Sequence, residues 1–344
     1  MELINHSPYT AGIVVDVDRD GADTLVLLVK ASFDIMPNGD LRVSPEQREI
    51  EWADVYAGEP GASSVLYESD ATWGRTGTDI ALVGHAYPQR AGDRQVDVGL
   101  RVGQMEKRAR VFGDRYWERM LGSVGISAPE PFEKIPLVWE RSFGGVDSTS
   151  ADPKDHDQEA RNPVGRGFRA KNSQTDLDGM RLPNVEDPSH LISDPTDHPS
   201  PIGFGFVAKS WAPRVGFAGT YDDAWQRARA PLLPDDYNPR FTVAASEGLW
   251  ATNGLFGGEV LDLVQMTPSG RLRCTLPTVN ILASYLAKVP PTNLNMHLAV
   301  VFIDTDLMTL TLLWQGSQRI HGLIDEIRWV RALEETTPHV ARVG

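Results

Sequence analysis

The chain has 344 residues, of which 41% are hydrophobic and 23% are charged. This length suits roughly two domains, and the composition is that of an ordinary globular protein, which excludes a disordered, collagen-like or disulfide-stapled chain. The 33 basic and 47 acidic residues give a net charge of −14 without any long basic run. Such a charge disfavours nucleic acid and anionic membranes as partners.

The basic residues are mostly arginine, with 26 arginines against 7 lysines. Arginine suits fixed, bidentate ion pairs more than loose solvation. Cys274 is the single cysteine, which excludes an intrachain disulfide. The first residues lack a signal-peptide pattern, and apolar runs such as 298–303 are far shorter than the roughly 20 residues that span a bilayer. We therefore expect a soluble, cytoplasmic protein.

Residues 1–145 are predicted to form an N-terminal β lobe. Residues 24–33 form a nearly continuous apolar run with Lys30 as the only charge, which predicts a strand buried on both faces. Residues 79–87 show the same pattern. Residues 95–102 alternate apolar and polar side chains, which is typical of an antiparallel strand with one wet face. Turn sequences separate these runs, so a sandwich or a distorted barrel is expected.

Residues 146–240 are predicted to be a loop region rich in proline and glycine. Residues 146–201 show little periodicity, carry a net negative charge and end in a cluster of prolines. Loops longer than about 15 residues are usually functional or disordered, and prolines favour an ordered, extended path. This segment is either a solvated insertion or a binding surface laid over the β scaffold. One short helix is predicted over 222–229, with Asp222 or Asp223 near its N-terminus and ended by Pro231.

Residues 241–344 are predicted to form a C-terminal β lobe that packs on the first. The β-compatible runs are residues 258–264, 271–276, 298–303, 308–314 and 324–330. Pro268-Ser269-Gly270 lies between the first two runs and is typical of a hairpin turn. The whole chain is therefore predicted to be mainly β, with two packed antiparallel β lobes, long ordered loops and a few short helices.

Signatures of catalysis are scarce. The sequence holds no P-loop, no H-E-x-x-H and no G-x-S-x-G. Residues 203–208 fit the loose dinucleotide pattern G-x-G-x-x-A, but no predicted strand precedes them, so a turn packed on the core is favoured. Cys274 alternates with Leu272 and Leu276, which indicates a small buried hydrophobe and not a nucleophile. No catalytic residue and no cofactor is predicted.

Metal binding and carboxylate chemistry remain weak alternatives. His190 and His198 share a loop with Asp194 and Asp197, but their spacing matches no standard zinc site. Solvated loop side chains are expected there, and no metal is predicted. Acidic pairs such as Asp222-Asp223 could hydrolyse a glycoside if folding placed two carboxylates at a suitable distance. Carboxylates near turns and helix starts are usually caps.

Short clusters of arginine, aromatic and acidic residues stand out from this background. Arginine guanidinium groups that lie beside aromatic rings and carboxylates can form buried, bidentate ion pairs. We expect the guanidinium of Arg141 to pair with a carboxylate or with carbonyls and so to hold the 146–201 loop. A structural role is predicted for the motif residues Glu140, Arg141, Gly144, Gly145, Asn162, Arg166, Asn184 and Glu186.

A protein-binding surface is predicted where the aromatic residues are densest. Tyr221 and Trp225 are four residues apart and would share one face of a helix. Trp211 and Arg214 precede a glycine-punctuated turn that could bring them alongside, and Arg229 follows. Tryptophan, tyrosine and arginine dominate binding hot spots. The competing interpretation is that this face packs inward and closes the core. If folded variants of these residues still bind the partner, the acidic 147–201 segment is the better candidate surface.

These clusters, taken in order, resemble domain-of-unknown-function family 2169 over about residues 1–277. The motifs are W-E-R-S-F-G-G, R-N-P-V-G-R-G-F, L-P-N-V-E, P-I-G-F-G, W-A-P-R, A-G-T-Y-D-D-A-W, R-A-P-L-L-P-D-D-Y and G-G-E-V-L-D-L. Each motif is modest, but eight in one order are specific. Asp235-Asp236-Tyr237 departs from the family pattern, in which Asp-Phe is expected, although the aromatic character is kept.

The resemblance implies an adaptor or chaperone of bacterial type VI secretion. Such a protein binds a toxin effector in the cytosol and helps to load it onto the VgrG–PAAR spike, so VgrG or PAAR proteins are further expected partners. The resemblance implies no catalytic residues, so the chain is not expected to be an enzyme. Two alternatives stay open: a hydrolase that uses carboxylates, and a structural component of the secretion apparatus.

Overall fold

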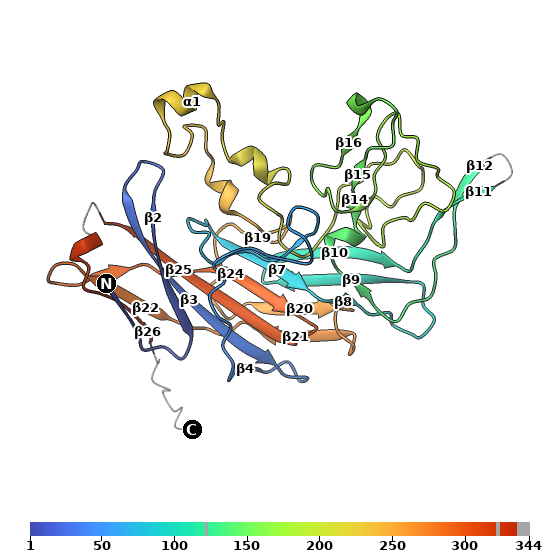
Figure 1. Ribbon diagram of the computed structural model, residues 1–344. Coiled ribbons are helices and arrows are strands. Elements are labelled where there is room, and N and C mark those ends of the chain that lie inside the picture. Colours follow the sequence, from blue (N-terminus) through green and yellow to red (C-terminus); the bar gives the residue numbers. More distant parts are fainter. Residues whose placement is uncertain (121–122, 321–323, 336–344) are drawn as a thin grey trace.

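A computed structural model (Figure 1) describes residues 1–120, 123–320 and 324–335 of the chain. The described chain is mainly β, with 38% of residues in strands and 7% in helices. Several open sheets pack in layers, and no barrel closes among these residues. The predicted mainly β class is therefore confirmed. None of the helices in this part of the chain combines the length and the apolar character that crossing a bilayer requires.

The largest sheet has seven strands. It runs in the order β19 (Trp250–Ala251), β7 (Thr78–Val83), β24 (His297–Asp304), β25 (Thr309–Arg319), β3 (Asp23–Ile35) and β2 (Thr10–Val17), and β4 (Leu41–Val43) pairs with the end of β3. The pair β7–β24 is parallel and the other pairs are antiparallel. The predicted strand over residues 24–33 thus lies near one edge of this sheet.

Two further sheets pack against the largest one. A five-stranded sheet runs β18 (Val185–Glu186), β10 (Met105–Phe112), β9 (Gln95–Val102), β20 (Val260–Val264) and β21 (Arg271–Thr275). A four-stranded sheet runs β1 (Glu2–Asn5), β26 (Trp329–Glu334), β22 (Ile281–Leu286) and β23 (Thr292–Leu294). The predicted hairpin turn at Pro268-Ser269-Gly270 joins β20 to β21.

The remaining elements are short. Small two-stranded pairs are β5 (Val55–Tyr56) with β6 (Val65–Tyr67), β8 (His85–Ala86) with β13 (Ile135–Pro136), β11 (Trp117–Met120) with β12 (Ser123–Ile126), β14 (Phe143–Gly144) with β17 (Arg166–Gly167), and β15 (Val146–Asp147) with β16 (Asp157–Gln158). The helices are α1 (Asp223–Ala228) and the 3₁₀ turns η1 (Trp139–Arg141), η2 (Pro153–Asp155), η3 (Arg214–Phe217), η4 (Pro239–Thr242) and η5 (Ile324–Glu326). The predicted short helix is α1, and Asp222 caps it.

Each of the three large sheets combines strands from both ends of the chain. β3 pairs with β25 along the whole of β25, β9 pairs with β20, and β1 pairs with β26. This arrangement differs from the expected division into a lobe at 1–145 and a lobe at 241–344, because the two segments share every large sheet. Strand patterns in a sequence show which face is buried, but they do not show which distant strand covers it.

Alternate residues of β3 face two different cores. Leu25, Leu27 and Val29 lie in the main core, between the seven-stranded sheet and the other two sheets. Val26 and Leu28 lie in a second core on the opposite face of the seven-stranded sheet. This burial of both faces is the pattern that the sequence predicted for residues 24–33, and it explains why the run has almost no polar residues.

Loop side chains cover the second core. They include Trp139, Phe206 and Trp211. Lys30 faces this side of β3 and is fully buried, and its Nζ lies 2.7 Å from Asp70 Oδ2. A buried ammonium group requires such a partner, so the single charge of the strand fixes the covering loop to the sheet.

One predicted strand is only partly correct. Residues 324–330 begin as the turn η5, and β26 starts only at Trp329. Ile324 and Ile327 are three residues apart, which is the repeat of a 3₁₀ turn, and the Ile327 N–H donates to the Ile324 carbonyl at 3.2 Å.

Candidate protein-binding site

The 146–201 segment is tied to the scaffold by Asn162. This side chain is fully buried, and its Nδ2 donates to the carbonyls of Trp139 and Phe143 at 2.9 Å each. Gly144 has φ +148°, and a Cβ there would lie 2.1 Å from the carbonyl oxygen of Asn162. A Cβ on Gly145 would lie 2.8 Å from a neighbouring backbone oxygen. The paired glycines of the first motif therefore allow the second motif to approach closely.

Glu140 and Arg166 extend the same connection. The carboxylate of Glu140 accepts from the backbone N–H and from Oγ of Ser64, at 2.8 and 2.9 Å. Arg166 Nε donates to the carbonyl of Glu140 at 2.8 Å. Burial lowers the pKa of Arg166, and the neighbouring Arg141 lowers it further. These contacts join three distant segments of the chain at one turn.

Arg141 pairs as the sequence predicted. Its NH1 donates to Asn184 Oδ1 at 2.9 Å and lies 3.4 Å from Asp114 Oδ1. In return the backbone N–H of Asn184 donates to the Arg141 carbonyl at 2.8 Å. Asn184 is fully buried, and its Nδ2 also donates to the Phe112 carbonyl at 3.0 Å. The arginine therefore holds the 146–201 loop at Asn184, next to the end of β10.

Glu186 completes the set of motif residues. It is almost fully buried and forms an ion pair with Arg115. Its Oε2 accepts from the backbone N–H of Ile192 at 2.9 Å. Burial raises the pKa of Glu186, and the nearby Arg115 opposes that rise. All eight residues for which the sequence suggested a structural role thus have partners inside the chain.

Arg214 lies inside a buried cluster of charges and not on a binding surface. Its side chain is 3% exposed and forms an ion pair with Glu68, which also pairs with Arg75 at 3.2 Å. Arg214 Nε donates to the Phe241 carbonyl at 2.8 Å and NH1 to the Val207 carbonyl at 2.6 Å. All three nitrogens of the Arg214 guanidinium therefore have partners inside the chain. The prediction that Arg214 contacts a binding partner is corrected: its role is structural.

The same cluster perturbs a buried carboxyl group. Asp79 lies in β7, with Oδ2 at 3.4 Å from Arg75 Nε, and it accepts from the backbone N–H of Ala244 at 2.9 Å. Burial raises its pKa to about 6, although Arg75 and the Ala244 N–H favour the charged form. The group is 1% exposed, so it lies out of reach of any solvent-borne substrate.

Trp211 is also buried. It is 3% exposed and packs edge-on against Trp139, with ring centroids 5.7 Å apart. Trp139 in turn donates from Nε1 to the Phe206 carbonyl at 2.9 Å. The interpretation that this aromatic residue closes the core therefore holds for Trp211. The sequence could not separate the two roles, because a hot-spot tryptophan and a core tryptophan have the same side chain and the same neighbours along the chain.

Tyr221 and Trp225 lie on an arm, defined here as residues 218–237, that projects from the body of the molecule (Figure 1). Tyr221 is 54% exposed, and its ring packs edge-on against the half-buried Trp225, with centroids 4.7 Å apart. Asp222 caps α1 by accepting from the Trp225 N–H at 2.8 Å. Trp225 Nε1 donates to the Leu232 carbonyl at 2.9 Å, so one ring is fixed and the other is presented to solvent.

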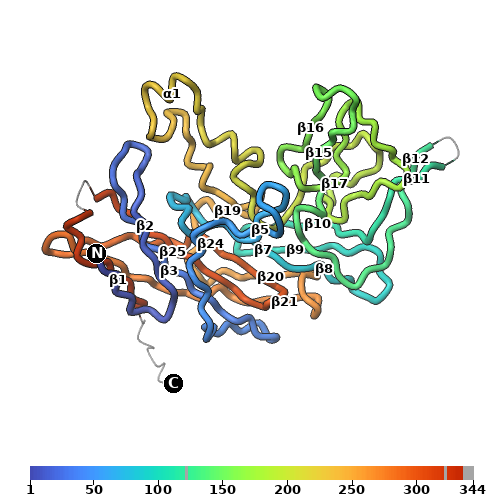
Figure 2. Tube along the Cα trace, in the orientation of Figure 1, coloured from blue at the N-terminus to red at the C-terminus, as the bar shows by residue number. Residues whose placement is uncertain are grey.

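The arm is held in place by its own hydrogen bonds and by the turn between β2 and β3. Asp236 accepts from the N–H and from Oγ1 of Thr220 at 2.9 and 2.7 Å. Arg229 donates from Nε to the Leu233 carbonyl at 2.9 Å and from NH2 to the Arg19 carbonyl at 2.7 Å. Figure 2 shows the arm and this turn side by side. Arg229 therefore positions the arm, and Tyr221 is its exposed contact group.

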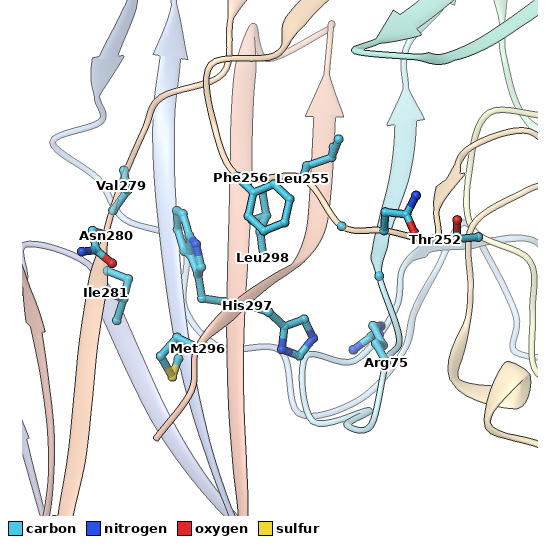
Figure 3. Close-up of a pocket in the computed structure, with 14 residues that line it drawn as sticks. Arg75, Thr252, Leu255, Phe256, Val279, Asn280, Ile281, Met296, His297 and Leu298 are labelled. Carbon is cyan, nitrogen blue, oxygen red and sulfur yellow. The ribbon is translucent and has the colours of Figure 1, made fainter. Parts of the chain in front are cut away.

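Sequence reasoning missed a hollow of about 420 Å³ beside β24 (Figure 3). In Figure 3, Val279–Ile281 lie on one side of the view and Arg75 on the other, with Phe256 and His297 between them. Phe256 is 78% exposed at this site. The sequence before Phe256 forms a turn with no clear strand or helix pattern. Only the exposure of its ring in the folded chain identifies Phe256 as a candidate contact residue.

A second hollow, of about 320 Å³, contains Lys107. Burial lowers the pKa of Lys107 to about 8, and its Nζ donates to Ser246 Oγ at 3.0 Å. Ser246 is 1% exposed, and its hydroxyl donates to the Gly203 carbonyl at 2.8 Å. The serine is therefore committed to a structural bond and offers no accessible nucleophile. A Cβ on Gly203 would lie 2.8 Å from the Trp139 ring, which fits a turn packed on the core.

The remaining chemical candidates lie apart from any cluster. His198 packs edge-on against Phe143 with centroids 5.8 Å apart. Among the described residues, no group of three histidine, cysteine or acidic side chains is placed to hold a metal ion. Cys274 is buried in β21, and burial raises the pKa of its thiol to about 11.

Comparisons with known proteins place the chain in a family without naming an activity. No curated protein and no solved structure matches it. One family model, described as "Uncharacterized protein conserved in bacteria (DUF2169)", matches residues 20–315. The match includes all the motif residues and the arm. The chain therefore belongs to this family of uncharacterized bacterial proteins.

Proposed function

We propose that the protein is an adaptor that binds a toxin effector of a type VI secretion system in the cytosol and assists its loading onto the VgrG–PAAR spike. The order of the motifs supports this role, since it resembles a family found with that apparatus. The exposed Tyr221, packed on the half-buried Trp225 of the arm, is the observation that carries the binding function.

The arm has the physical properties of a binding element. Tyrosine and tryptophan offer a large contact area with few rotatable bonds, so little conformational entropy is lost on binding. The internal hydrogen bonds of Trp225 and Arg229 order the arm before any partner arrives, which reduces the cost of association further. Asp222 and Asp223 are exposed beside the pair and give the contact an acidic rim. A partner with an apolar pocket and basic surroundings fits this surface.

A pull-down from the native bacterium tests this function. The tagged chain is recovered from wild-type cells and from cells that lack single effector genes, and bound proteins are identified by mass spectrometry. An adaptor recovers one effector, and it recovers spike proteins only when that effector is present. Recovery of the apparatus regardless of effector would instead assign the chain to the structural components. Recovery of neither would refute both roles.

A further inference from the structure

The outer face of the five-stranded sheet is basic, although the chain as a whole is strongly acidic. The strand register places five arginines on this face: Arg101, Arg108, Arg110, Arg271 and Arg273. All are exposed or half-exposed. The register places four carboxylates on the same face, including Glu186 opposite Arg110, so five arginines still give it a net positive charge within a chain of net charge −14. We call this surface the arginine face.

The carboxylates on the arginine face are already paired. Asp262 is 7% exposed beneath Arg271, which reaches it at 3.0 and 2.6 Å. Asp97 accepts a similar bidentate pair of hydrogen bonds from Arg110 Nε and NH2, at 2.7 and 3.0 Å. In the described part of the chain, no carboxylate or carbonyl accepts a hydrogen bond from the Arg273 guanidinium. Positive charge therefore remains available to an incoming group.

A hollow of about 370 Å³ lies in the middle of the arginine face. Gly99 forms part of its floor, because a Cβ there would meet Arg108 and Val264 only at 3.8 Å. Val264 is 39% exposed and gives the floor an apolar patch. Arg101, Arg108 and Arg271 also line the hollow. An extended peptide could lie in it with acidic side chains against the guanidinium groups.

The arginine face backs onto the main core, whereas the arm grows from the second core; at the β10 end of the face, Arg108 also lines the Lys107 hollow with Ala212 and Pro213. The inner face of the five-stranded sheet contributes Val98 and Leu100 to the main core. The seven-stranded sheet follows, and the second core covers its far side. The arm grows from that far side, since Trp211 and Ala244 near its base belong to the second core (Figure 1).

We propose that the arginine face docks an acidic, extended segment of a second partner while the arm holds the first. The inference rests on the proposed function, because an adaptor must hold two proteins at once. A guanidinium group can bind a carboxylate through two parallel hydrogen bonds. Arg273 and the remaining donors of Arg101 and Arg108 can bind the carboxylates of the segment in this way. The paired carboxylates and the chain's net negative charge repel a continuous phosphate backbone, so a peptide with spaced carboxylates fits better than a nucleic acid.

A titration with a labelled peptide of alternating glutamate and threonine tests the proposal by fluorescence anisotropy. The variant Arg108→Glu/Arg273→Glu should weaken binding at least about ten-fold, because reversed charges repel the probe. Arg273 has no partner to lose, and Glu106, the partner of Arg108 at 2.6 Å, is itself exposed. The matched control is Arg227→Glu/Arg328→Glu, which makes the same change of net charge at exposed sites outside the face. Its affinity should stay within about two-fold of wild type.

Gly99→Val provides a second variant that leaves every charge in place. Valine favours strands, and the space above Gly99 is open to 3.8 Å, so folding should persist while the hollow is filled. This variant should also weaken peptide binding, whereas a lysine version of the peptide should not bind wild type. Unchanged affinity in both face variants would overturn the proposal. Tighter, face-dependent binding of single-stranded RNA would also overturn it and would assign the face to nucleic acid.

The peptide titration and the effector pull-down separate the two proposals. Effector capture without face-dependent peptide binding would leave the adaptor role standing and refute the acidic docking site. Face-dependent peptide binding without effector capture would support the docking site and refute the adaptor role.

Discussion

Replacing Arg214 by lysine distinguishes a buried structural arginine from a surface contact. The three donor groups of Arg214 point to the Phe241 carbonyl, the Val207 carbonyl and the Glu68 carboxylate. A lysine ammonium can keep the charge next to Glu68, but it cannot reach both carbonyls from one atom. We therefore expect Arg214→Lys to lose two of the three contacts in a site that water does not enter.

The expected loss of stability follows from the two orphaned carbonyls. Each buried acceptor left without a donor costs about 1–3 kcal/mol, so two predict a loss of roughly 2–6 kcal/mol in the free energy of unfolding. Urea unfolding followed by tryptophan fluorescence measures it as a lower midpoint at an unchanged slope. Arg227→Lys, on the exposed face of α1, is the matched control and should change the free energy by less than about 0.5 kcal/mol. An unchanged midpoint in Arg214→Lys, or lost effector capture at an unchanged midpoint, would refute the structural assignment.

Three further predictions concern other parts of the fold. Arg141→Lys should lower the thermal midpoint by an amount equivalent to about 1–3 kcal/mol, because a point charge cannot serve both Asn184 and Asp114; an unchanged midpoint would contradict this. Burial alone would raise the pKa of Asp147, but hydrogen bonds from its neighbours lower this pKa from 3.8 to about 2. The charged carboxylate therefore stabilises the fold above pH 4. That contribution is lost as the pH falls towards 2. Asp147→Asn should thus cost about 2 kcal/mol at pH 7 and only a small part of that near pH 2, as measured by urea unfolding across that range. The Cys274 thiol, with its raised pKa and its buried position, should resist a maleimide reagent at pH 8 until urea unfolds the chain; fast labelling of the native protein would contradict that burial.

The strands could be predicted from the sequence where the burial of one or both faces of a single strand determines the residue pattern. The apolar run at 24–33 and the alternation at 95–102 each report on the faces of a single strand, and both were read correctly. The pairing of β3 with β25 was not predictable, because the two strands are separated by almost the whole chain and any apolar face can cover another. The division into terminal lobes came from sequence proximity, and sequence proximity does not govern sheet order.

The candidate site divides in the same way. The hydrogen bonds of α1 are local, so the sequence alone indicated Asp222 or Asp223 near its N-terminus, and Asp222 is the cap in the structure. Arg214 needs Glu68, which lies 146 positions away, and that partner decides whether the arginine faces water or the core. The arginine face was also hidden, because its arginines are spread over three strands, where they alternate with apolar residues, and never form a long basic run.

The affinity of the captured effector for Tyr221→Ala tests the central claim, binding through the arm, most directly. Tyr221 is 54% exposed, so its truncation should leave the urea midpoint unchanged. Phe256→Ala, which removes another exposed ring outside the arm, is the control. We predict that Tyr221→Ala weakens binding by about 2 kcal/mol or more, roughly thirty-fold, while Phe256→Ala binds as wild type does. Full affinity in Tyr221→Ala, or a loss confined to Phe256→Ala, would contradict binding through the arm.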